Sequence, residues 1–132
     1  MAVTFLLVDY SIVYTSTFTV MEYITIVLFA LAAILGITIL VNWLNKKDAP
    51  RGVVYSHGLF AAVALVLLIV YVVNNRTNAP TTSLILFVLA ALGGFYMFTR
   101  DLNKKNSPIA VAVLHALLAV GGFVALLIFV FA

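Results

Sequence analysis

One segment of this chain occurs twice, and each copy contains a histidine. The segment reads LNKKDAPRGVVYSH in the first copy and LNKKNSPIAVAVLH in the second. Residues 26–73 align without a gap with residues 84–131, so each residue is equivalent to the one 58 positions later (from His57 to His115). Internal similarity over this length indicates a duplicated structural unit. We therefore expect two copies of one unit, with the only two histidines of the chain in equivalent places.

The composition indicates that this unit folds in lipid. Of the 132 residues, 66% are hydrophobic and 8% are charged, whereas soluble domains carry about 25% charged residues. A soluble fold of this size could not bury so much apolar surface, so the surrounding medium must be a bilayer. The chain has no cysteine, which excludes disulfides and thiolate metal sites.

Four apolar segments are long enough to cross a hydrocarbon core of about 30 Å as helices. They run approximately over Glu22–Trp43, Gly52–Val73, Ser83–Phe98 and Pro108–Phe131, and Thr81 and Thr82 extend the third. Repeat one then covers about 22–73 and repeat two about 82–131. We expect an all-α integral membrane fold, an antiparallel four-helix transmembrane bundle made of two tandem helical hairpins. Because each repeat crosses twice, the copies form a parallel repeat with a pseudo-twofold axis along the membrane normal.

Residues 1–20 lie outside the repeat. They are rich in β-branched and aromatic residues without a clear helical stripe, and no positive segment precedes an apolar core as in a signal peptide. We interpret them as an upstream extension or, alternatively, as an interfacial arm. In the first case Met21 is the natural start, and residues 21–132 form a single transmembrane domain.

The distribution of basic residues predicts the orientation in the membrane. Arg76 lies in the loop between the second and third segments, and the other basic residues lie in the turns 44–51 and 100–107. These are Lys46, Lys47, Arg51, Arg100, Lys104 and Lys105. The positive-inside rule places both turns in the cytoplasm and both termini outside. We expect a multi-pass protein of the bacterial inner (cytoplasmic) membrane.

The two histidines are the candidate functional residues. On helices that run the same way they lie at the same depth, roughly 10 Å from the start of each helix, and the pseudo-twofold axis makes them face each other. Residues four and seven positions later share the histidine's helix face, and they are all small: Ala61, Ala64, Ala119 and Gly122. Two facing imidazoles with room beside them can supply both axial ligands of one haem b. The leading hypothesis is a haem site at His57 and His115 with these four residues beside the macrocycle.

Two other interpretations of the histidines stay open. Small residues on a transmembrane helix also permit close helix packing, and a buried neutral histidine can bond a neighbouring hydroxyl or carbonyl. The chain would then be a non-enzymatic accessory or interaction subunit of a membrane complex. Ionisable groups inside a membrane also serve proton, metal or quinone chemistry, which suits a small proton or solute transporter. Two imidazoles without a carboxylate or thiolate make a poor zinc site.

Two resemblances bear on these hypotheses. The sequences HGLFA (His57–Ala61) and LHALLAVGGFVALL (Leu114–Leu127) resemble small bacterial inner-membrane proteins with four spans and a repeated histidine-containing hairpin. That resemblance covers about residues 21–132 and implies fold and location without an activity. The layout is also similar to four-helix membrane b-type cytochromes of the cytochrome b561-like kind, at His57 and His115 only. The usual four haem-ligating histidines are missing, so this similarity implies at most one haem, near one membrane face.

No motif indicates an enzyme. The sequence has no nucleophile–base set, phosphate-binding loop or nucleotide fingerprint, and Glu22 and Asp101 are interpreted as solvated or interfacial charges. The expected partners are the lipid bilayer and a membrane redox partner or larger membrane complex. A second copy of the chain is a further candidate. Nucleic acid is not expected, because clustered positive charges in a membrane chain report orientation first.

Overall fold

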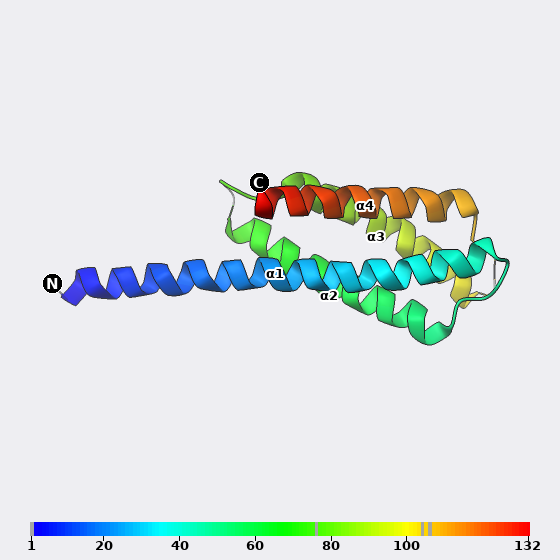
Figure 1. Cartoon of the computed structure of the whole chain (residues 1–132), viewed down its shortest axis with the longest axis horizontal. Helices are drawn as coiled ribbons and strands as arrows, with labels where there is room; N and C mark the ends of the chain where they lie inside the picture. The colour runs from blue at the N-terminus through cyan, green and yellow to red at the C-terminus, as the bar shows by residue number, and fades with distance from the viewer. Residues whose placement is uncertain (1, 76, 104, 106) are drawn as a thin grey trace.

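The described part of this protein is made up of four helices. The computed structural model describes the backbone of residues 2–75, 77–103, 105 and 107–132, and the side chains from residue 19 onward within those ranges. The helices are α1 (Ala2–Leu44), α2 (Arg51–Asn74), α3 (Thr81–Leu102) and α4 (Ile109–Phe131) (Figure 1). Each contains a segment long and apolar enough to cross a membrane, which in α1 is Thr19–Leu44. The chain is therefore a multi-pass integral membrane protein.

Helix α1 differs most from its predicted span. It begins at Ala2 rather than near Glu22, so residues 2–20 continue the first span as helix. As a result, α1 reaches past the ends of the other helices (Figure 1). β-Branched and aromatic residues lower helix propensity only modestly, and their surroundings readily override that preference. The other three helices begin and end within a few residues of the predicted spans, and Thr81 and Thr82 open α3 as expected.

Proline starts both helices that follow a basic turn. Pro50 and Pro108 are the N-cap residues of α2 and α4. The Pro50 carbonyl accepts hydrogen bonds from the N–H groups three and four positions later, at 2.9 and 3.2 Å, and the Pro108 carbonyl does so at 3.0 and 3.3 Å. The two copies therefore enter their second helix in the same way, which gives equivalent residues the same depth.

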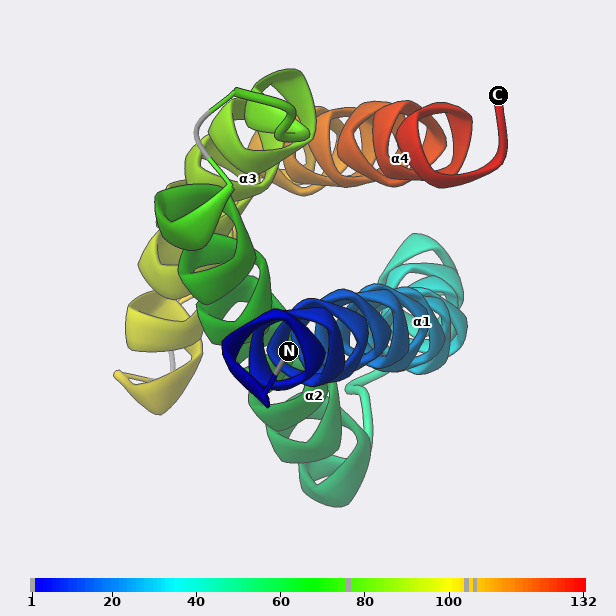
Figure 2. The ribbon, with the colours of Figure 1, turned by 90° about the vertical axis from the view of Figure 1, so that its left-hand side faces the viewer.

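The helices pair into two antiparallel hairpins, α1 with α2 and α3 with α4. Contacts are dense within each hairpin, whereas α2 meets α3, and α1 meets α4, much more sparsely. Figure 2 shows the two hairpins side by side in an end-on view. The predicted bundle of two tandem hairpins is confirmed.

Three pairs of equivalent aromatic or imidazole rings contact each other between the hairpins. They are Phe29 with Phe87, His57 with His115 and Tyr71 with Phe129, whose ring centroids are 3.7, 6.1 and 6.2 Å apart respectively. A residue meets its own equivalent only where it lies beside the symmetry axis. Because Tyr71 lies about 21 Å along α2 from His57, these contacts define an axis that runs along the helices. An inverted repeat would bring equivalents together at a single level, so the parallel repeat is confirmed.

The core lies on this axis in the middle of the bundle. It is formed by Phe29, Ala64, Leu68, Phe87 and Leu126, which are all buried. Most other large apolar side chains point outward; Leu117, for example, is 66% exposed. Such a surface is stable only where lipid covers it. The fold therefore buries a narrow central stripe and presents the rest of its apolar surface to the membrane.

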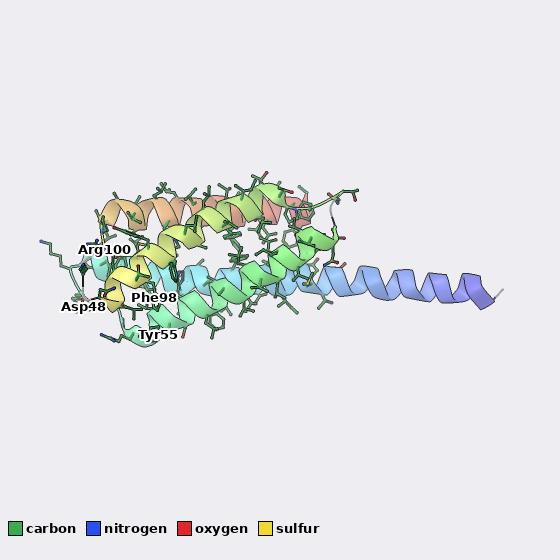
Figure 3. The ribbon with its side chains drawn as sticks, turned by 180° about the vertical axis from the view of Figure 1, so that it is seen from behind. Asp48, Tyr55, Phe98 and Arg100 are labelled. Carbon is green, nitrogen blue, oxygen red and sulfur yellow. The ribbon has the colours of Figure 1, made fainter. Side chains whose placement is uncertain are left out.

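The two basic turns lie at one end of the bundle. Figure 3 shows Asp48 of the first turn near Arg100 at the end of α3. Lys46, Lys47 and Lys105 are exposed at this end. Two residues on which the predicted orientation also rests, Arg76 and Lys104, lie outside the described residues.

Candidate functional site

The two histidines meet at the pseudo-twofold axis near the basic end. His57 lies six residues into α2 and His115 six residues into α4, so each ring is about 9 Å from the start of its helix. The ring centroids are 6.1 Å apart and the ring planes are inclined at 72°. Both residues are partly buried. The structure thus brings together the two side chains that the duplicated sequence predicts to face each other.

Each imidazole is anchored to the partner helix of its own hairpin. His57 Nδ1 lies 2.8 Å from the carbonyl oxygen of Ala32, and His115 Nδ1 lies 2.7 Å from that of Ala90. A carbonyl only accepts, so Nδ1 is the protonated nitrogen and donates the bond. In the neutral ring Nε2 then carries the lone pair. Both copies therefore hold the imidazole in the same tautomer and leave Nε2 as the free nitrogen.

Two equivalent glycines make room for these rings. A Cβ atom placed on Gly36 would lie 3.0 Å from Cε1 of His57, and one placed on Gly94 would lie 3.0 Å from Cε1 of His115. Contacts this short are tighter than nine in ten real Cβ contacts, so a side chain here requires the imidazole to shift by a few tenths of an ångström. Gly36 and Gly94 therefore make room for the histidines. From the sequence alone, small residues on a transmembrane helix suggest only close helix packing.

The four small residues predicted beside a macrocycle have different surroundings. Ala61 and Ala119 are partly buried. Ala64 is fully buried, at 0% exposure, and a Cβ on Gly122 would lie 3.2 Å from the Phe87 ring. The stacked rings of Phe29 and Phe87 therefore occupy the space at Ala64 and Gly122, on the side of the histidines toward the middle of the bundle.

The far end of the bundle contains a polar contact that the sequence did not reveal. Glu22 of α1 interacts with the Tyr71 hydroxyl of α2, so this charge has a polar neighbour on the next helix. The sequence could not reveal this pairing, because the two residues lie on different helices with no fixed spacing between them. The apolar core separates this contact from the histidines, so we find no continuous polar route between them among the described residues.

The backbone acceptors of the site also escaped sequence reasoning. Every residue has a carbonyl, so nothing in the residue types singles out Ala32 and Ala90 as partners of the histidines. A usable signal was the retention of Gly36 and Gly94 in both copies.

Comparison of the chain with protein-family models, curated proteins and solved structures finds no match in any of the three.

Proposed function

We propose that this integral membrane protein binds one b-type haem, with His57 and His115 as its axial ligands, for one-electron transfer or haem handling. The observation that carries the proposal is the facing pair of imidazoles, each held through Nδ1 so that Nε2 is free. Metal-ligating histidines almost always donate their other ring N–H in this way, to a carbonyl, carboxylate or water.

The spacing of the rings supports the proposal. A metal bonded to one nitrogen of each ring at about 2.0–2.1 Å holds the two ring centres roughly 6 Å apart, and the centres here are 6.1 Å apart. The hairpins contact each other sparsely, and a macrocycle held by both histidines would lie at their boundary. Because phenyl rings fill the space at Ala64 and Gly122, Ala61 and Ala119 remain the candidates to lie beside it.

The residues of the site then have distinct roles. Haem iron, when bound, supplies exchange of one electron. His57 and His115 would hold the haem iron. The carbonyls of Ala32 and Ala90 would fix the orientation of the rings and increase the basicity of Nε2, and Gly36 would keep the His57 ring in its seat.

We further infer that both basic turns face the cytoplasm of a bacterial inner membrane, with both termini outside. The exposed lysines at this end support that orientation. The histidine pair lies near the same end, so a redox partner would reach it from the cytoplasmic side. A thiol reagent that cannot cross the membrane should label Lys47→Cys in opened vesicles and not in intact cells. Labelling in intact cells would reverse the orientation.

Haem reconstitution tests the main proposal. Purified protein mixed with haemin in detergent should show a Soret band and a six-coordinate low-spin spectrum, with one haem per chain. His57→Ala and His115→Ala should each lose the low-spin spectrum, because one axial nitrogen is gone. Gly58→Ala is the control, since a Cβ there meets nothing within 4 Å. Folded wild-type protein that stays colourless, or a spectrum unaffected by both histidine changes, rules the proposal out.

A second candidate is an accessory subunit whose histidines are structural. The Nδ1 bonds favour it, because each ties α2 to α1 or α4 to α3. His57→Asn and His115→Asn separate the two functions, since the asparagine amide can replace Nδ1–H but has no counterpart of Nε2. A structural histidine tolerates this change with little loss of stability. An axial ligand does not, and haem binding should fail in a folded variant.

A further inference from the structure

Both histidines keep an unpartnered nitrogen at the axis. No described residue donates a hydrogen bond to either Nε2, because each ring makes only its Nδ1 contact and the contact with the other ring. Two imidazoles whose ring centres lie 6.1 Å apart each offer a lone pair to an electron-pair acceptor between the packed helices. The inference concerns the haem-free chain, because a haem held between the histidines would occupy the same two nitrogens.

We propose that Nε2 of His57 and Nε2 of His115, with the thioether of Met97, bind one soft monovalent metal cation of the Cu(I) class. The 6.1 Å between ring centres fits a single ion bonded to both rings, since bonds of about 2.0–2.1 Å require roughly 6 Å. The Nδ1 bonds to Ala32 and Ala90 supply the outer contacts that orient such ligands.

Met97 offers a third donor on the adjoining turn of α3. It is buried, at 7% exposure, and lies one turn along α3 from Gly94, the residue against which the His115 ring rests. Residues three apart share a helix face, so Met97 lies on the face that meets His115. The equivalent residue in repeat one is Ile39, also buried, at 8% exposure. At this position repeat two therefore has a donor atom that repeat one lacks. Thioether sulfur favours Cu(I).

The charge of the site selects the class of ion. All three donors are neutral, and among the described residues no group of three or more His, Cys, Asp or Glu side chains could hold a metal. Structural zinc takes four donors, and Mg²⁺ and Ca²⁺ take oxygen ligands. The penalty for burying an ion without a counter-charge rises steeply with its charge. The class that remains is a soft monovalent cation, which two or three nitrogen and sulfur donors can coordinate.

Silver(I), a redox-inert stand-in for Cu(I), provides the test. Calorimetric titration of the full-length protein in detergent should show one Ag⁺ per chain. His57→Asn and His115→Asn, which keep a donor for the carbonyls, should each weaken binding by about 100-fold or more, beyond what loss of an outer contact causes. Met97→Ile copies the residue of repeat one and should weaken binding about 10-fold, whereas Ile39→Met copies repeat two and should strengthen it.

The outcomes separate this inference from the haem proposal. Ag⁺ binding with this pattern, in protein that takes up no haem, would remove the proposed function and leave the cation site standing. Folded wild-type protein that binds no Ag⁺ would overturn the cation site, as would affinity that neither asparagine variant changes. Unchanged affinity in both Met97→Ile and Ile39→Met, which do not touch the histidine bonds, would overturn the three-donor site.

Discussion

Leu126→Ala should lower the free energy of unfolding by about 2–3 kcal/mol. Leu126 is 1% exposed at the axis of the bundle, so removing most of its side chain leaves a cavity that the packed helices cannot fill. Lipid is as apolar as leucine, so the loss comes from broken packing rather than from transfer to water. We therefore expect a loss of unfolding free energy in the lower part of the range known for leucine-to-alanine changes in soluble cores. Leu68→Ala, at the equivalent position with 2% exposure, should lose a similar amount.

The matched controls are leucines of the same two helices that face lipid. Leu117 and Leu59 are 66% and 63% exposed, and their replacement by alanine should change stability by less than about 0.5 kcal/mol. Reversible unfolding in mixed micelles or bicelles would measure all four variants. A loss at Leu117 as large as that at Leu126 would show that the assignment of inner and outer faces is wrong.

Gly94→Leu should disrupt the histidine pair and destabilise the bundle by on the order of 3 kcal/mol. A side chain at this position starts 3.0 Å from Cε1 and 3.4 Å from Nδ1 of His115. The ring cannot retreat without losing the 2.7 Å bond to Ala90. Gly36→Leu should have the same effect on His57, whose ring lies equally close. Haem and silver binding should be lost in both variants, although neither replaces a proposed ligand.

Gly58→Leu is the control for these two variants. Gly58 is also a transmembrane glycine, and a Cβ on it meets nothing within 4 Å, so the larger side chain should extend into lipid. We expect unchanged binding and a neutral or slightly improved stability, because leucine is a better helix former than glycine. Thermal unfolding followed by circular dichroism compares the three variants. Equal losses at all three glycines would attribute the effect to glycine itself rather than to the seat of the imidazole.

The architecture of this chain could be predicted because it rests on patterns that lie along the sequence. The length of the apolar segments indicates four spans, and the alignment of LNKK and proline in both copies indicates a duplicated hairpin. Equivalent residues at equivalent depth follow from the duplication alone. The facing of His57 and His115 was thus accessible to sequence reasoning, and the structure bears out that placement.

The surroundings of the histidines could not be predicted, because they depend on which helices face each other. Ala64 and Gly122 are small, which indicates space, but only the arrangement of the hairpins shows that Phe29 and Phe87 fill it. The helical start of α1 at Ala2 escaped prediction for another reason. Residue preferences over that stretch are weak, so composition does not determine where the helix begins.

The proposed site depends on the contact between the two imidazoles. NMR of the protein labelled with ¹⁵N-histidine in lipid tests this contact most directly. We expect both rings to be protonated at Nδ1 and unprotonated at Nε2, with a through-space cross-peak between the ring protons of His57 and His115. His57→Asn and His115→Asn should each remove that cross-peak and one set of ring signals. A folded protein without the cross-peak, or with either ring protonated at Nε2 instead of Nδ1, would contradict the paired site.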